Sequence, residues 1–397
     1  MKPLKAYENV LNLCINMSSK QQVVDSYPIY ANIDPTTYCN LSCPACTTGL
    51  KLNLRPVQTM KFDHYKAIID EIGDYLFQVL LYNWGEPLLH KQAPEFIRYA
   101  KEKEINVQIS TNFSIKFSDD YLERLVKSGL NLILIALDGA TPETYSKYRR
   151  GGDFNLVREN MLRLRIIRDK LGYKTPTIAW KFVVFRHNEH EVQKAIDEHK
   201  DWGADTMVFD AAVMPSDPYN DGIEPSTMPE FNTYVSERRR KAIAENLAKT
   251  SGCSRLWGVT AFGPTGRVYP CCWVSEEEDD FGQYSESEGF LSAWNSPRYQ
   301  QARRSFANRT KGSTIKSEDE FMKILHATDG SGMGKAGAVK KDGLVCNRCP
   351  VPEEWNHVEE LIKLMIPDMS PGKEKDLLLR ALQVLHEGEL SFKDQIA

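Results

Sequence analysis

The feature that most constrains the fold is a regular alternation of short apolar runs and longer helical stretches between residues 30 and 209. Runs rich in β-branched residues predict strands, and stretches with apolar residues every three or four positions predict helices. Strands that alternate with helices build a parallel sheet. The expected strands are 30–34, 77–82, 106–110, 132–136, 177–185 and 206–209, and the expected helices are 61–72, 93–103, 119–128, 156–171 and 189–202.

These six units predict an α/β fold, a partial (β/α)6 barrel similar to an incomplete TIM barrel. Right-handed crossovers bring the loops that follow the strands to one end of a barrel, so chemistry is expected there. A small α+β module and C-terminal helices should follow. We expect an N-terminal helical segment at 1–27, the barrel at 28–210, a linker and helix at 211–250, the module at 251–352 with a mobile polar insertion at 308–343, and helices at 353–397.

Composition narrows the range of functions. The chain has 397 residues, is 42% hydrophobic and 26% charged, and carries a net charge of -4. Such a balance provides no large cationic field, so neither nucleic acid nor a membrane surface is an expected partner. Its first residues lack the apolar core of a signal peptide, and no apolar run reaches the ~18 residues needed to cross a bilayer. We therefore expect a cytoplasmic protein.

Three of the nine cysteines lie within eight residues, directly after the first expected strand. Cys39, Cys43 and Cys46 form a CxxxCxxC motif on a loop at the expected active end of the barrel. A 4Fe-4S cluster is usually held by four Cys, so three close thiolates would leave one iron open. Zinc is the alternative, although its structural sites usually use two separated pairs of ligands. A disulfide does not suit a reducing compartment.

A CxxxCxxC loop after the first strand of a βα barrel resembles the radical S-adenosylmethionine (SAM) superfamily. The resemblance implies that SAM binds the open iron and is cleaved to a 5′-deoxyadenosyl radical, which abstracts a substrate hydrogen. It also implies contacts with SAM from a Gly-Glu-Pro segment after the second strand, from polar residues after the third, and from an Asp and an Arg after the fourth. The matching residues are Gly85, Glu86, Ser110, Asn112, Asp138 and Arg149.

Two positions depart from the family pattern. Relatives commonly have an aromatic residue before the third cysteine, where it contacts adenine, but this chain has Ala45. Adenine would then rest on Tyr38, on Tyr82 or on the strand end at 183–185, and the sequence does not choose among them. A glycine often precedes the Gly-Glu-Pro segment, whereas here Trp84 would shape the substrate pocket.

A second cysteine group lies downstream and could saturate another 4Fe-4S cluster. Its surroundings, a GRVYPCC hairpin and an FLSAWNSPRYQQARRSF helix, resemble the SPASM and twitch extensions of radical SAM enzymes, and the cysteine count favours the twitch type with one auxiliary cluster. Zinc again remains the alternative. The expected ligands are Cys253, Cys271, Cys346 and Cys349. Cys272 is then spare, either as a small buried residue or as a tentative catalytic hydrogen donor, because neighbouring side chains of an extended hairpin diverge.

The expected function is that of a radical SAM oxidoreductase with SAM and two 4Fe-4S clusters as cofactors and with flavodoxin or ferredoxin as electron donor. We expect dehydrogenation of a small polyol, sugar or amino sugar, with the auxiliary cluster as electron acceptor. Epimerisation through Cys272 and modification of a peptide are the alternatives. The ~28 residues before the first strand are few for a leader-binding domain, which disfavours a peptide. A non-enzymatic zinc scaffold is the alternative outside enzymes.

Overall fold

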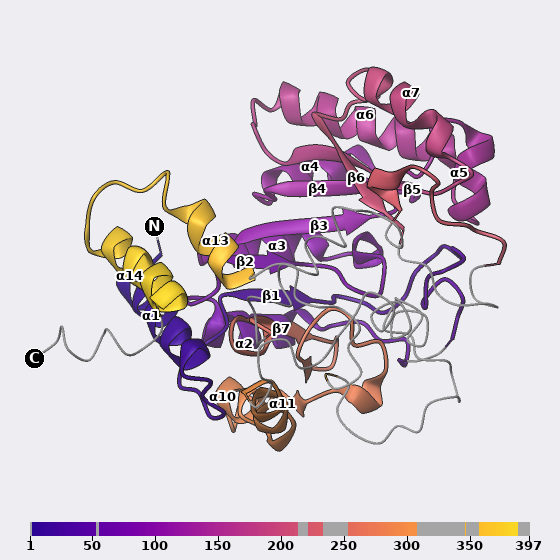
Figure 1. The fold of residues 1–397 in the computed structure, drawn as a ribbon. Helices are drawn as coiled ribbons and strands as arrows, with labels where there is room; N and C mark the ends of the chain where they lie inside the picture. Colours follow the sequence, from indigo (N-terminus) through magenta and orange to yellow (C-terminus); the bar gives the residue numbers. More distant parts are fainter. Residues whose placement is uncertain are drawn as a thin grey trace, which may run out of the picture.

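A computed structural model describes residues 2–52, 55–212, 221–232, 253–307, 346 and 357–387. Within these ranges a nine-stranded sheet runs through the molecule in the order β6-β5-β4-β3-β2-β1-β7-β8-β9 (Figure 1). The sheet is open, so the prediction of a partial barrel is confirmed. Its strands are β1 (Tyr30–Ile33), β2 (Gln78–Leu80), β3 (Asn106–Thr111), β4 (Leu132–Ala136), β5 (Thr177–Val184), β6 (Thr206–Ala211), β7 (Val259–Phe262), β8 (Arg267–Tyr269) and β9 (Gly282–Gln283).

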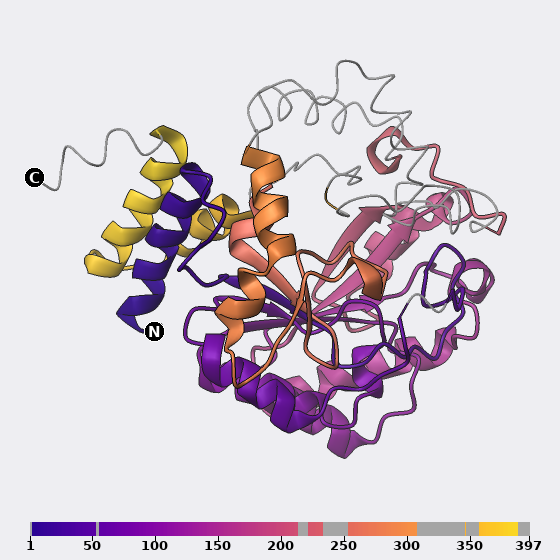
Figure 2. The same ribbon diagram turned by 90° about the horizontal axis from the view of Figure 1, so that it is seen from below.

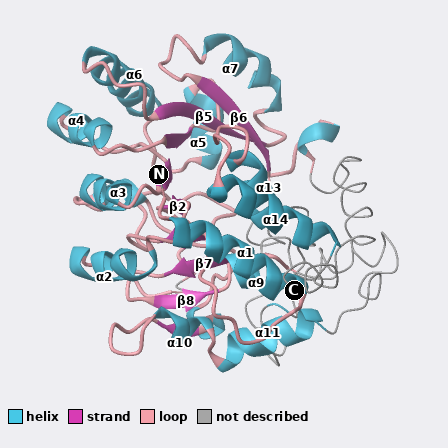
Figure 3. Ribbon diagram, turned by 90° about the vertical axis from the view of Figure 1, so that its left-hand side faces the viewer, coloured by secondary structure: helices cyan, strands magenta, loops and turns pink. Residues whose placement is uncertain are grey.

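Neighbouring strands from β1 to β6 are parallel and follow the chain order, as right-handed βα units require. The helices that connect them lie in a row along one side of the sheet, which Figure 2 shows from below and Figure 3 from the side. These helices are α2 (Phe62–Ile72), α3 (Ala93–Glu102), α4 (Asp119–Lys127), α6 (Phe154–Lys170) and α7 (Val192–Glu198). The short helix α5 (Pro142–Tyr148) precedes α6 and lies at the carboxyl end of the sheet (Figure 1). Two 3-10 turns, η1 (Pro87–Leu89) and η2 (Glu189–Glu191), belong to the same connections, whereas η3 (Pro229–Phe231) follows β6 and η4 (Glu277–Asp279) follows β8.

The two faces of the sheet differ in chemistry. Alternate residues such as Ile133 and Ile135 of β4 belong to the core between the sheet and the helices. Because side chains alternate along a strand, the residues between them face the opposite, concave side. That side is partly polar: Gln108 donates a hydrogen bond to the Tyr82 hydroxyl over 3.3 Å, and Lys181 pairs with Asp210 at 2.8 Å. The concave face is therefore suited to a polar ligand.

Two helical predictions need correction. Helix α5 was not expected, although Thr141 accepts a hydrogen bond from the Thr144 amide and Pro142 occupies the first turn, both of which are signals of a helix start. The expected helix at 189–202 is shorter: η2 precedes α7, which ends at Glu198. Most of the helix expected in the linker and all of the insertion at 308–343 lie outside the described residues.

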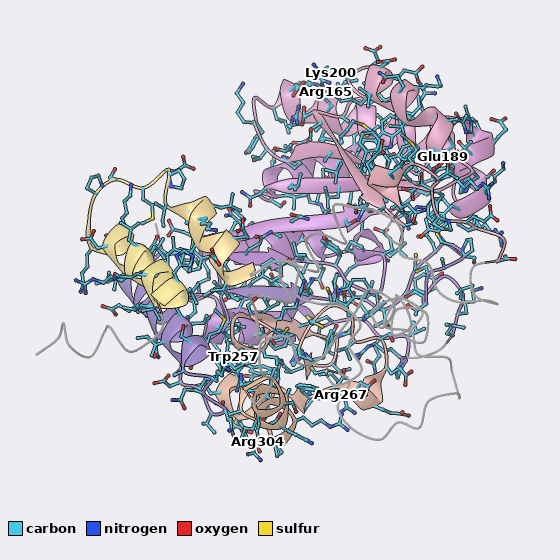
Figure 4. The ribbon with its side chains drawn as sticks, in the orientation of Figure 1. Arg165, Glu189, Lys200, Trp257, Arg267 and Arg304 are labelled. Atoms are coloured by element: carbon cyan, nitrogen blue, oxygen red, sulfur yellow. The ribbon has the colours of Figure 1, made fainter. Side chains whose placement is uncertain are left out.

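The downstream module shares the barrel's sheet. Strand β7 pairs in parallel with β1, and β8 and β9 then pair antiparallel. Gly266, with φ +81°, turns the chain into β8, so the predicted hairpin is present. The predicted helix after it is broken into α10 (Phe290–Trp294) and α11 (Pro297–Ala307), and α9 (Arg255–Gly258) precedes β7. Trp257 of α9, labelled in Figure 4, donates from Nε1 to the Gln21 carbonyl over 2.9 Å.

A second, smaller core joins the two ends of the described chain. Helix α1 (Leu4–Ser18) lies beside α14 (Lys373–Glu387), and α13 (His357–Met365) completes the cluster (Figure 1). Leu13, Ile362 and Leu378 are fully buried there, and so is Cys14. In the described part of the chain, no helix is long and apolar enough to cross a membrane.

Candidate active site

The CxxxCxxC loop leaves β1 at the carboxyl end of the sheet, where the ends of the neighbouring strands meet. Cys39, Cys43 and Cys46 are free thiols, and Cys43 is 5% exposed. Two groups approach them, one from the end of β3 and one from the end of helix α5. Asn112 Nδ2 lies 3.7 Å from Cys39 Sγ, and Arg149 Nη1 lies 4.0 Å from Cys43 Sγ. The fold therefore brings the first cysteine group together with two of the predicted SAM contacts.

Close backbone packing holds this loop in shape. The Ser42 amide donates to the Arg150 carbonyl over 2.9 Å, and the Leu50 amide donates to the Cys46 carbonyl over 2.8 Å. A Cβ at Gly49 would lie 2.4 Å from the Cys43 carbonyl oxygen, so only glycine allows the loop to fold back on itself. Ala45 adopts a left-handed conformation, with φ 61°.

Burial disfavours the ionised form of Cys39 and Cys43. Burial raises the pKa of Cys39 to about 11 and that of Cys43 to about 12; the neighbouring thiols add to the effect and Arg149 opposes it. Iron favours the thiolate, so metal binding would release protons from this loop and stabilise its folded form. The donor set therefore fits a cationic cluster.

Zinc and a 4Fe-4S cluster require different arrangements of cysteine thiolates. Among the described residues, no three His, Cys, Asp or Glu side chains converge on a position for a single metal ion. A zinc ion needs such convergence, because every thiolate must reach it at about 2.3 Å. A 4Fe-4S cluster does not, since each thiolate binds a different iron. Three cysteine thiolates on one loop suit a 4Fe-4S cluster, as the CxxxCxxC motif predicts.

Gly85 and Glu86 follow β2 and lie against the cysteine loop. A Cβ on Gly85 would lie 1.8 Å from the Thr36 carbonyl oxygen, so the approach requires glycine. The buried Glu86 carboxylate accepts hydrogen bonds from the Thr111 hydroxyl at 2.6 Å and from the amides of Asn112 and Leu88 at 2.7 and 3.1 Å. Glu86 thus ties the end of β2 to the end of β3. Its predicted contact with the methionine ammonium stays a prediction.

Asp138 and Arg149, both predicted SAM contacts, pair with each other. Arg149 Nε lies 2.5 Å from Asp138 Oδ2, and the other Asp138 oxygen accepts from the Val183 amide over 2.6 Å. Asp138 is fully buried and Arg149 is 15% exposed. Asp138 therefore holds the guanidinium toward Cys43 and has little capacity left for a ligand, whereas Arg149 retains N–H donors for a carboxylate.

Arg149→Ala should weaken SAM binding by ~1.5 to 3 kcal/mol, because a charge-assisted hydrogen bond to the methionine carboxylate is lost. Isothermal titration of SAM into the reconstituted protein, with iron content measured in parallel, checks this. Arg98→Ala is the control, since its guanidinium pairs with Glu102 on the exposed surface of α3. Unchanged SAM affinity in Arg149→Ala would mean that Arg149 does not bind SAM and only pairs with Asp138.

The predicted ribose contacts lie at the end of β3. Asn112 is buried, and besides Cys39 its Nδ2 reaches Asn40 Oδ1 at 3.0 Å, while its Oδ1 accepts from the Ser114 amide over 2.9 Å. Asn112 therefore orients the cysteine loop. Ser110 lies on β3, two residues after Gln108 and on the same concave face. The role of both residues toward SAM stays a prediction.

The structure places one candidate adenine contact beside Ala45. Ala45 packs into an apolar cluster at the end of β5 that contains Phe185 and Ile223. Of the three sites that the sequence left open, the strand end at 183–185 is thus the one that adjoins Ala45. Tyr38 is 50% exposed and lies outside this cluster. Sequence reasoning missed Ile223, which lies in the linker and has no local pattern that marks it.

The second cysteine group is described in part, because Cys349 lies outside the described residues. Cys253 and Cys346 both pack against the main core, and Cys271 packs with Ala261 and Val274. Burial raises the pKa of Tyr299; Thr260 and Arg303 oppose this effect, and the Cys346 and Cys271 thiols add to it. This arrangement is compatible with Cys271 as a ligand and leaves the ligand assignment a prediction.

Cys272 has different neighbours from Cys271. Arg255 Nη1 lies 3.9 Å from its sulfur, and burial, with a contribution from Cys272, raises the pKa of Tyr82 to about 12. Tyr82 is on the concave face of the sheet, where its hydroxyl accepts from Gln108. The extended hairpin from which their divergence was predicted does not reach the two cysteines: β8 ends at Tyr269, and Cys271 and Cys272 lie in a bend and a turn. Their divergence therefore stays a prediction.

A buried clamp joins the cysteine loop to the downstream module. Arg55 forms two bonds with Asp280, at 2.6 and 3.0 Å, and stacks 4.5 Å from the centre of the Tyr269 ring. Trp84 donates from Nε1 to the Val274 carbonyl over 3.1 Å. Arg55, Trp84 and Cys39 also line a cavity of about 200 Å³. Trp84, predicted to shape the substrate pocket, therefore also fixes the module beside the first cysteine group.

Comparison with known proteins gives two family matches. Residues 33–198 match the radical SAM superfamily, and residues 253–329 match an iron-sulfur cluster-binding domain, SPASM. Mycofactocin maturase MftC of Mycobacterium ulcerans is 24% identical over 295 residues, which cover 70% of this chain and 77% of that protein. Fe-coproporphyrin III synthase of Methanosarcina barkeri is 32% identical over 114 residues, or 29% of this chain and 28% of that protein.

Solved structures agree on the fold. SuiB of Streptococcus suis bound to SAM superposes with a TM-score of 0.57 at 15% identity, over 80% of this chain and 78% of that one. The chain spans only 24% to 32% of the length of the first three curated relatives it matches. Radical SAM domains use SAM, and both matched domains bind iron-sulfur clusters, so SAM and 4Fe-4S clusters are the cofactors of this enzyme. Residues 33–198 thus form a radical SAM domain, and residues 253–329 match a SPASM iron-sulfur domain that follows it.

Proposed function

We propose that this radical SAM enzyme abstracts a hydrogen atom from a peptide substrate held against the concave face of its sheet. The observation that carries the choice of a peptide is the alignment with mycofactocin maturase MftC, which extends over 295 residues and 70% of this chain. PqqA peptide cyclase of Granulibacter bethesdensis, 24% identical over 169 residues, points the same way. The relatives give no support to the polyol, sugar or amino-sugar substrate expected from the sequence.

The chain's own residues would divide the work at the site. Cys39, Cys43 and Cys46 would hold the first cluster, and Arg149, held by Asp138, would bind the SAM carboxylate. When bound, the cluster and SAM supply the 5′-deoxyadenosyl radical that removes a hydrogen atom from a C–H bond. The Cys253, Cys271, Cys346 and Cys349 set would hold the auxiliary cluster. The clamp between Arg55 and Asp280 would keep the downstream module over the barrel and exclude water.

Release of 5′-deoxyadenosine tests the substrate class. The anaerobically reconstituted enzyme is given SAM and dithionite, then a pool of synthetic peptides or a pool of polyols, sugars and amino sugars. Peptides should stimulate release above the substrate-free rate, because a bound substrate gives the radical a C–H bond to attack. Flavodoxin or ferredoxin in place of dithionite tests the expected electron donor. Stimulation by the sugar pool alone would contradict the peptide proposal and restore the earlier expectation.

Dehydrogenation remains the favoured fate of the substrate radical, with a proton lost to solvent and an electron passed to the auxiliary cluster. In deuterated water the product should then be lighter by two hydrogens, and Cys272→Ala should leave turnover within about twofold, since no thiol takes part. Mass spectrometry of the product checks both. Cys272→Ser serves as the matched control for packing.

Epimerisation is the second candidate, because the Cys272 sulfur, 3.9 Å from Arg255 Nη1, also contributes to the raised pKa of Tyr82, a residue on the concave face of the sheet. A product that loses no hydrogen, gains one solvent deuterium and disappears in Cys272→Ala would contradict dehydrogenation. It would identify Cys272 as the hydrogen donor.

A further inference from the structure

A cavity of about 440 Å³ opens beside the cysteine loop, at the carboxyl ends of β4 and β5. Its size is within the ~300 to 1,000 Å³ of ordinary ligand sites. The lining is rich in charge: three cationic side chains and a histidine face two carboxylates. The lining residues are Lys147, Arg150, Arg186, His187, Asp221, Gly222, Ile223 and Glu224.

The cavity adjoins the candidate active site through the backbone. Arg150 follows Arg149, and its carbonyl accepts from the Ser42 amide inside the CxxxCxxC motif over 2.9 Å. Ile223, on another wall, belongs to the apolar cluster that includes Ala45. A ligand in the cavity would therefore lie next to the SAM site.

The chain's own linker already occupies the rim of this cavity as an acidic peptide would. Asp221 pairs with Arg150, and Glu224, three residues later, pairs with Arg186 at 2.7 Å. The Arg186 amide also donates to the Glu224 carbonyl over 3.1 Å. The adjoining pair Phe185 and Pro225 forms an antiparallel bridge, so the segment is added to the end of β5 like a short extra strand.

These pairs leave capacity for a further anion. The side chains of Arg150 and Asp221 are 43% and 57% exposed, and those of Arg186 and Glu224 are both 58% exposed. Exposed pairs contribute ~0 to 1 kcal/mol and can be exchanged for a stronger partner. Each guanidinium has five N–H donors, and a contact through one nitrogen leaves the other nitrogens available for a further anion. Lys147 adds a third, exposed cation.

The other groups around the cavity are fixed. Glu189, labelled in Figure 4, accepts from the hydroxyls of Ser226 and Thr227 at 2.6 Å and anchors the linker segment from behind. His187 stacks on Phe185 with ring centroids 5.4 Å apart. Burial, and then Lys147, lowers the pKa of His187, so the ring is neutral at pH 7 and does not add to the positive charge.

We propose that this cavity binds a carboxylate side chain of an acidic peptide substrate, through Lys147, Arg150 and Arg186, and so positions the peptide beside the SAM site. The inference rests on the proposed peptide substrate and specifies that this peptide is acidic. The whole chain is acidic, with a net charge of -4. A cavity lined by three cations next to the active site would therefore attract acidic peptides at this one place.

Binding of two blocked, fluorophore-labelled peptides to the SAM-loaded holoenzyme tests this by fluorescence anisotropy. Hexaglutamate should bind at least tenfold more tightly than hexaglutamine, and more weakly as salt rises. Lys147→Glu with Arg186→Gln should weaken hexaglutamate binding at least tenfold. The matched control, Lys66→Glu with Arg98→Gln, changes exposed residues on α2 and α3 and should alter binding less than twofold.

A second variant separates ligand binding from structure. Asp221→Asn with Glu224→Gln removes the internal carboxylates and should tighten hexaglutamate binding at least threefold, because the arginines lose their competitors. Damage to the fold would weaken binding instead. Equal binding of the two peptides, or no response to either pair of substitutions, would overturn the inference.

Two further outcomes separate this inference from its alternatives. Displacement of hexaglutamate by inorganic phosphate, but not by blocked glutamate, would assign the cavity to a phosphate group and overturn the peptide assignment. Peptide binding is measured without turnover, so it is independent of the release assay. If hexaglutamate does not bind selectively but peptides still stimulate release of 5′-deoxyadenosine, the carboxylate site is wrong and the proposed function stands. Selective binding of hexaglutamate without that stimulation would support the carboxylate site and contradict the peptide reaction.

Discussion

Replacing Cys39, Cys43 and Cys46 together by Ala should remove about half of the bound iron and abolish formation of 5′-deoxyadenosine, because only one of two 4Fe-4S clusters loses its ligands. The two cysteine sets share no residue, and the described members of the second set pack in the downstream module and against the main core. Iron analysis and SAM cleavage by the anaerobically reconstituted variant provide the measurement. Even uncoupled cleavage without substrate should fall below detection.

The control is Cys14→Ala, which removes a buried thiol from the core of α1 and α14 and should leave iron and cleavage unchanged. Loss of all iron in the triple variant would mean that the clusters depend on each other. Full retention would place the first cluster elsewhere. Zinc in place of iron would restore the scaffold alternative.

The sequence predicted those parts of the site that follow from local order along the chain. Alternating βα patterns place the loops after parallel strands at one edge, which is why Cys39, Asn112 and Arg149 could be predicted to meet from motifs far apart in sequence. The contact between Asp138 and Arg149 is also local in sequence, because only one short helix separates the two residues. The break in the βα pattern after residue 209 was also enough to predict a second module.

Parts of the site that depend on long-range packing could not be predicted. Ile223 reaches Ala45 only because the linker is added to the end of β5. Sequence alone also suggested a module that starts afresh near residue 251, whereas β7 joins the barrel's sheet beside β1. Neither pairing has a signature in the residues involved, because hydrogen bonds between backbones do not depend on side-chain identity. Helix α5 is different, since its cap at Thr141 is a readable signal.

Arg55→Ala should destabilise the protein by ~3 to 5 kcal/mol, because it leaves a buried carboxylate without its partner. The side chains of Arg55 and Asp280 are 8% and 1% exposed, and the guanidinium also reaches the carbonyls of Val274 and Glu276, each at 3.2 Å. Unfolding of the anaerobic holoenzyme in urea, followed by tryptophan fluorescence, measures the change. Arg267→Ala is the control: its pair with Glu277 is 43% and 29% exposed, so it should cost less than ~1 kcal/mol.

Removing both charges separates the value of the clamp from the penalty of an unpaired charge. Arg55→Met with Asp280→Leu should cost less than Arg55→Ala alone, because neither a buried anion nor a buried cation remains. If the double variant is stable but loses peptide-stimulated release of 5′-deoxyadenosine while SAM still binds, the clamp acts by holding the downstream module in register with the cysteine loop. A double variant as unstable as the single one would contradict this account, because the loss would then come from packing around Tyr269 and not from charge.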